Sequence, residues 1–95
     1  MLVVPLHTAV EKQIQTSAGE VVLESYGGFP KEESNLYMIG SDGKLKWRAE
    51  KPDPRTLYSR VKLNDDYTLS TFTISGHLCE LDLNTGKIIS SSSLS

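Results

Sequence analysis

Residues 35–47 read NLYMIGSDGKLKW, and residues 77–89 read HLCELDLNTGKII. Each stretch predicts a β-strand, a turn that ends in Gly-Lys, and a second strand. The turn glycines, Gly43 and Gly86, are 43 residues apart, whereas the strands that precede them are 42 residues apart. The offset therefore changes inside the turn, where an insertion is tolerated best. A period in the low forties is typical of four-stranded β units, so the sequence predicts two such units.

Residues 44–50 alternate strictly between charged and apolar side chains. Successive side chains of a strand point to opposite faces. The pattern therefore predicts that Leu45, Trp47 and Ala49 face the core together while the charged residues face water. The Asp-Gly pair before this strand can supply the positive φ values of a tight hairpin turn.

The remaining segments predict an all-β fold joined by short turns. The predicted strands are residues 10–16, 20–26, 35–39, 44–50, 58–63, 67–74, 77–83 and 87–91. Residues 51–55 contain two prolines, which cannot both lie in a central strand, so this segment separates the two halves. We predict one domain over residues 1–95, with about eight antiparallel strands in two four-stranded, blade-like meanders over residues 7–50 and 58–91. A β-sandwich of the same strands is the alternative.

Composition and charge exclude several classes of function. The 95 residues carry a net charge of −2, which provides no positive patch for nucleic acid or for an anionic membrane. The one cysteine excludes a disulfide within the chain. The apolar run of residues 1–6 is too short for the core of a signal peptide, and no segment approaches the roughly 20 apolar residues of a membrane span. We therefore expect a cytoplasmic protein that binds neither nucleic acid nor membranes.

Residues 76–88, GHLCELDLNTGKI, resemble the repeat of quinoprotein-type β-propellers. Trp47 follows Gly43 by four residues, as the tryptophan of that repeat does, and Ser90 takes this place in the second stretch. Over residues 7–89 the chain also resembles short, uncharacterised bacterial proteins with the same motifs. The resemblance implies a propeller-like fold. It implies no quinone cofactor, because two units cannot close the ring of blades that holds one, and we expect no cofactor.

His77 and Cys79 are the candidate catalytic pair, because residues two apart in a strand share a face. In a hydrolase, His77 would activate the Cys79 thiol. A metal site would need His7 as a third ligand. Two candidate ligands only two residues apart do not have the spacing typical of a zinc site. We therefore favour Cys79 as a buried structural cysteine and His77 as a surface histidine.

Aromatic residues are the candidate ligand contacts. Tyr26 and Phe29 lie in a glycine-containing loop, and exposed loops carry function more often than strands do. Tyr58 begins a predicted strand and is the third candidate. Trp47 would serve a carbohydrate-binding module, although the alternation predicts that it packs in the core.

The sequence favours a non-enzymatic module that binds a protein or a small ligand through loops at the sheet ends. A small hydrolase that uses Cys79 and His77 is one alternative, and a carbohydrate-binding module is another. Two small sheets can leave apolar faces for another copy of the chain, so we also expect a homo-oligomer.

Overall fold

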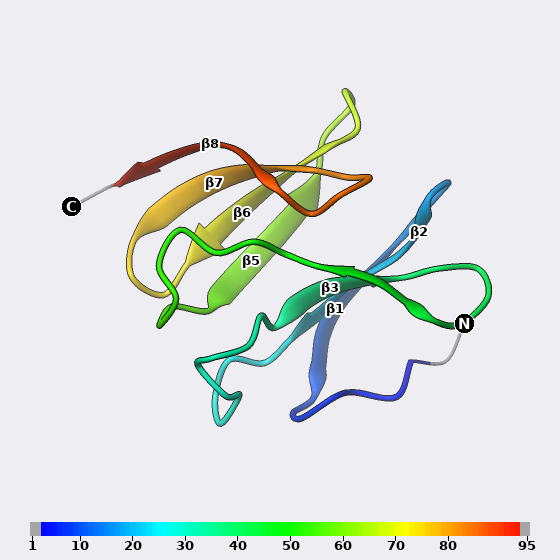
Figure 1. Cartoon of the computed structure of the whole chain (residues 1–95), viewed down its shortest axis with the longest axis horizontal. Helices are drawn as coiled ribbons and strands as arrows, with labels where there is room; N and C mark the ends of the chain where they lie inside the picture. Colours follow the sequence, from blue (N-terminus) through cyan, green and yellow to red (C-terminus); the bar gives the residue numbers. More distant parts are fainter. Residues whose placement is uncertain (1–2, 94–95) are drawn as a thin grey trace.

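The computed structural model describes residues 3–93, which form two four-stranded antiparallel sheets (Figure 1). Sheet A has the strand order β1-β2-β3-β4, and sheet B has the order β5-β6-β7-β8. The strands are β1 (Val10–Thr16), β2 (Gly19–Glu24), β3 (Leu36–Ile39), β4 (Leu45–Arg48), β5 (Tyr58–Leu63), β6 (Thr68–Thr73), β7 (His77–Asp82) and β8 (Ile88–Ser93). Within each sheet every strand pairs with its neighbour in sequence, and all the pairs are antiparallel. The predicted all-β fold of eight antiparallel strands in two open sheets is confirmed.

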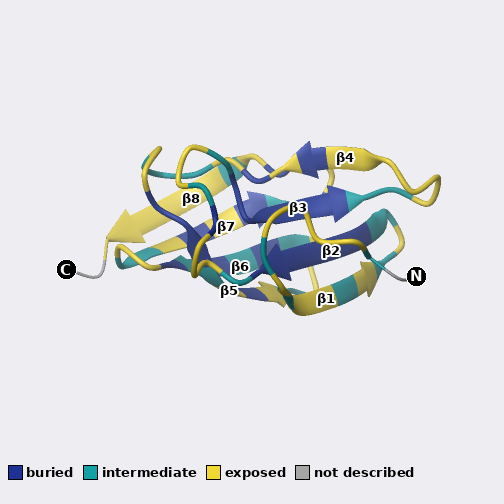
Figure 2. Cartoon of the chain, turned by 90° about the horizontal axis from the view of Figure 1, so that it is seen from below, coloured by how far each residue is buried: buried dark blue, intermediate teal, exposed yellow. Residues whose placement is uncertain are grey.

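The two sheets share one hydrophobic core, in which the inner face of sheet A packs against the inner face of sheet B. Figure 2 shows this as dark blue on β2 and β3, whereas β1 and β8 are largely exposed. The core consists of Val21, Leu23, Leu36, Met38, Trp47, Ala49, Tyr58, Val61, Leu69, Cys79, Leu81 and Leu83. The inner apolar faces of the two sheets therefore cover each other.

Leu36 and Leu78 hold the same position in the two matching stretches, but the structure places them differently. Leu36 is fully buried in the core, whereas Leu78 is 45% exposed on the outer face of sheet B. In β7 the core side chains are instead Cys79 and Leu81, one residue further along. Successive side chains of a strand point to opposite faces. The positions of β3 that face the core therefore match positions of β7 that face outward.

Leu45 is an exception to the predicted alternation. Met38 pairs with Trp47, but the next residue, Ile39, pairs with Leu45, so one residue of β4 is left unpaired as a bulge. A bulge of one residue moves every side chain beyond it to the other face. The prediction that Leu45 faces the core was therefore wrong, and its side chain is 42% exposed on the outer face of sheet A.

Trp47 joins the end of sheet A to the turn between β7 and β8. Its indole Nε1 donates a hydrogen bond to the backbone oxygen of Leu83, at 2.9 Å. The ring lies so close to Gly86 that a Cβ added there would come within 2.4 Å of it. Glu50 forms two further hydrogen bonds to the same turn. Its backbone nitrogen donates to the oxygen of Gly86 at 2.8 Å, and its Oε1 accepts from the backbone nitrogen of Ile88 at 2.9 Å.

Asn35 and Lys12 cover the free edge of β5. The amide of Asn35 is fully buried; its Nδ2 donates to the oxygen of Tyr58 at 2.7 Å, and its Oδ1 accepts from the nitrogen of Tyr58 at 2.8 Å. Nζ of Lys12 donates to the oxygen of Val61 at 2.9 Å. These side chains take backbone groups that would otherwise be open to another strand, which is how natural sheets protect their edges.

Glu24 holds the segment that precedes β1 against the outer face of sheet A. Its buried carboxylate accepts hydrogen bonds from the backbone nitrogens of Leu6, His7 and Thr8, and from the hydroxyl of Tyr37. Burial raises the pKa of Glu24, but these four hydrogen bonds to the charged form outweigh it and hold the pKa below its ordinary value. Burial and the neighbouring carboxylate raise the pKa of the Tyr37 hydroxyl, so this group stays a donor.

Substitution of Gly86 by alanine is expected to destabilise the protein by about 2–5 kcal/mol, because the new methyl group meets the Trp47 ring in a left-handed backbone conformation. Gly43 is the matched control, since its φ of +80° is similar but no atom lies within 4 Å of an added Cβ. Gly43→Ala should cost only the backbone term of about 1–2 kcal/mol. Urea denaturation followed by circular dichroism measures both, and equal losses would contradict the role given to Trp47.

Glu24→Gln is expected to lower the free energy of unfolding at neutral pH by about 2 kcal/mol, because an amide cannot accept all of the hydrogen bonds that the carboxylate accepts. The folded-state pKa of Glu24 lies below the ordinary value of 4.5. The stabilisation is therefore complete above that value and is lost as the pH falls through the lower, folded-state pKa. Urea denaturation at several acidic pH values should show a shallower decline for Glu24→Gln than for the wild type. The exposed Glu80→Gln is the control, and parallel curves for wild type and Glu24→Gln would refute this account.

Candidate functional site

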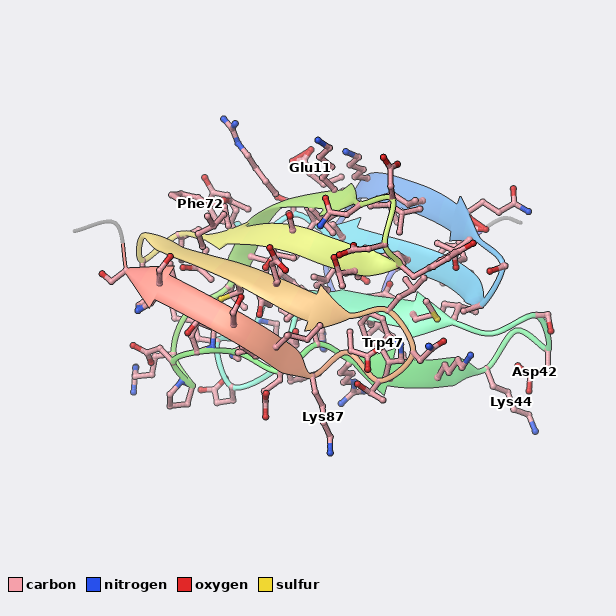
Figure 3. All side chains as sticks on the ribbon, turned by 90° about the horizontal axis from the view of Figure 1, so that it is seen from above. Glu11, Asp42, Lys44, Trp47, Phe72 and Lys87 are labelled. Carbon is pink, nitrogen blue, oxygen red and sulfur yellow. The ribbon has the colours of Figure 1, made fainter. Side chains whose placement is uncertain are left out.

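An open hollow lies along β5, and we call it the β5 groove. It is an open depression of about 1040 Å³. Strands of both sheets line it with Glu11, Lys12, Leu23, Tyr26, Ser59, Arg60, Val61, Lys62, Ser70, Thr71, Phe72 and Leu78. In Figure 3, Glu11 and Phe72 lie on one side of the molecule, and Trp47 and Lys87 lie on the other.

Two β-bulges shape this groove. The register of β1 and β2 shifts between Val10 and Lys12, which leaves Glu11 unpaired. The register of β5 and β6 shifts between Tyr58 and Arg60, which leaves Ser59 unpaired. Both unpaired residues line the groove. Bulges bend a strand and redirect its side chains, and they are common beside binding sites.

The floor of the groove on sheet B is a row of cross-strand neighbours. Arg60 pairs with Phe72, and Phe72 pairs with Leu78, so the three side chains stand side by side on the outer face. Lys62 pairs with Ser70 in the adjacent row. A positively charged edge therefore borders an apolar centre on the same face.

The structure brings only one of the three predicted ligand-contact residues to the groove. Tyr26 is 50% exposed and lines it. Phe29 is buried, and its ring meets the edge of the His7 ring at a centroid distance of 5.0 Å. Tyr58 is fully buried in the core, where its hydroxyl donates to the oxygen of Glu50 at 2.5 Å. Neither ring presents surface to a ligand, because Tyr58 packs in the core and Phe29 is buried with its ring against His7.

Cys79 and His77 do not form an accessible catalytic pair. Cys79 is fully buried in the core, and burial raises the pKa of its thiol despite hydrogen bonds with Tyr58 and Thr71. His77 uses its Nδ1 in a hydrogen bond with Oγ of Ser75, at 3.1 Å. A thiol that is both neutral and covered is a poor nucleophile.

Among residues 3–93, no three His, Cys, Asp or Glu side chains lie close enough together to hold a metal ion. The third ligand considered, His7, instead lies beside Glu33, with its Nε2 3.1 Å from either carboxylate oxygen. These contacts fix the segment before β1 on the loop that precedes β3.

Sequence reasoning missed Arg60, Lys62 and Leu78, and it did not select Phe72 from the aromatic residues as a ligand contact. The alternation of Arg60 and Lys62 in a predicted strand could have placed both on the solvent face. Leu78 is next to Cys79, which was expected to be buried, so the same alternation could have placed Leu78 on the opposite, outer face. Nothing in the sequence indicates that β1 and β5 lie close together, so the groove itself follows only from the packing of the two sheets.

The buried thiol provides a direct test of the hydrolase alternative. Iodoacetamide should alkylate Cys79 of the folded protein at neutral pH at least about tenfold more slowly than in urea, because the reagent reaches it only when the core opens. Mass spectrometry at timed intervals gives both rates. Equal rates in the folded and unfolded protein would show that the thiol is reachable in the native state.

Comparison with known proteins corrects the resemblance seen in the sequence. No curated protein matches the chain. A family comparison matches residues 2–92, but not to a quinoprotein-type propeller repeat, so the predicted family was wrong. Among residues 3–93 there is no helix that could span a bilayer. The match covers nearly the whole chain, and the protein therefore belongs to the family described as Domain of unknown function (DUF7957).

Proposed function

We propose that the protein is a non-enzymatic binding module that holds an extended segment of another protein in the β5 groove. The observation that carries this proposal is an apolar surface in an open hollow, formed by the exposed Tyr26 and Leu78 and the half-buried Phe72. Tyrosine and phenylalanine offer large contact areas at a small cost in side-chain entropy, which is why they are frequent in binding surfaces.

The groove favours recognition through side chains over strand addition. A bound strand would need the free backbone groups of the β5 edge, but Asn35 and Lys12 already occupy those of Tyr58 and Val61. Side-chain pockets provide specificity without such pairing. The site therefore lies on the edge and outer face of sheet B, and it shares only Tyr26 with the loop surface expected from the sequence.

Two other functions have less support. A hydrolase would need an accessible thiolate, whereas Cys79 is buried and its pKa is raised. The carbohydrate-binding alternative relied on Trp47, which is buried against Gly86 with its Nε1 bonded to the oxygen of Leu83. Association with a second copy stays a prediction, for which light scattering is the measurement.

Tyr26→Ala is expected to weaken binding of selected peptides by about tenfold, because it removes an exposed aromatic anchor from the groove. Dodecapeptides would be selected by phage display on the immobilised wild-type protein, and their affinities measured by fluorescence anisotropy. Tyr67→Ala is the matched control, since Tyr67 is 67% exposed but does not line the groove.

The control variant should bind the selected peptides as the wild type does. Equal losses for both tyrosine variants, or a selection that yields no binding peptide, would overturn the proposal. Circular dichroism of both variants confirms that the fold is retained, which the exposure of both side chains favours.

A further inference from the structure

We infer that the segment held in the β5 groove is acidic, with an apolar side chain beside its acidic residues; this rests on the proposed function. Arg60 and Lys62 are two residues apart on the outer face of β5, and both are exposed. Neither takes part in an ion pair within residues 3–93. Two exposed cations without a partner at the edge of an apolar surface match a negatively charged ligand.

The charge of the groove is opposite to that of the whole protein. The chain has a net charge of −2, whereas three cations and one carboxylate, Glu11, line the groove. Lys12 donates a hydrogen bond to the oxygen of Val61 at 2.9 Å, which places its Nζ at the edge of β5. Glu80 shares a row with Lys62 but is separated from it by β6, at about two strand spacings, so it screens Lys62 only weakly.

The order of the side chains indicates how such a segment would lie. Arg60, Phe72 and Leu78 form one row, from the edge of sheet B to its centre. A carboxylate of the ligand would meet the planar guanidinium of Arg60, which can donate two parallel hydrogen bonds to it. The next apolar side chain of the ligand would then rest on Phe72 and Leu78.

A protein segment fits these charges better than nucleic acid does. A nucleic-acid strand presents a continuous row of phosphates and needs several cations along its path. The carboxylate of Glu11 lies among the cations that line the groove and interrupts such a path. A peptide can place its few acidic residues over Arg60 and Lys62 alone.

The experiment uses a fluorescein-labelled dodecapeptide that alternates glutamate with leucine and tyrosine, and a second peptide with lysine in place of glutamate. Anisotropy should show that the acidic peptide binds the wild type at least about tenfold more tightly. Arg60→Glu with Lys62→Glu should weaken its binding at least about tenfold. Lys44→Glu with Arg48→Glu makes the same change of net charge on exposed residues of the β4 region, and should change the affinity less than about threefold.

Equal affinities for the two peptides, equal losses in the two charge-reversal variants, or tighter binding of a twelve-nucleotide oligothymidylate would overturn this inference. Selected peptides that lack acidic residues but depend on Tyr26 would refute the acidic ligand while the binding module stands. If no peptide depends on Tyr26, both proposals fail. Urea denaturation of each double variant establishes that it is folded, so a loss of affinity reports on the groove.

Discussion

The contact between Trp47 and the turn of β7 and β8 is the constraint on which the arrangement of the two sheets depends. The indole both fills the space beside Gly86 and donates to the oxygen of Leu83, so it fixes distance and orientation together. Because a buried N–H without a partner is costly, the ring has one satisfactory position. Glu50 adds two further hydrogen bonds to the same turn, and the halves of the chain therefore pack as one body with a common core.

The same packing creates the β5 groove and determines how it can be used. Sheet A approaches the free edge of β5 closely enough for Asn35 and Lys12 to bond its backbone. Those backbone groups of the edge are thereby closed to strand pairing, while the outer face beyond it carries the exposed Arg60 and the half-buried Phe72. Edge protection and the proposed ligand surface thus lie side by side on one strand, one through the backbone and the other through side chains.

Local patterns in the sequence predicted the strands well, and the errors have identifiable causes. The alternation that placed Trp47 in the core was right, but it failed at Leu45, because a bulge has no simple signature in hydrophobic periodicity. Tyr26 was found through its glycine-containing loop. Phe29 and Tyr58 were aromatic candidates of the same kind, and only their neighbours in space, His7 and Glu50, explain why they are buried. Motif similarity suggested a propeller repeat, which the family match does not support.

The sequence by itself determined the all-β class, the two groups of four strands and the turns with their glycines, because these depend on residues close together in the chain. Only the tertiary structure decided that the matching strands β3 and β7 turn opposite faces inward. Leu36 and Leu78 occupy matching places in similar strands, yet one is buried and the other lines the groove. A strand pattern defines two faces but does not say which of them another sheet will cover, and that choice was made by the docking of Trp47 on a turn 36 residues away.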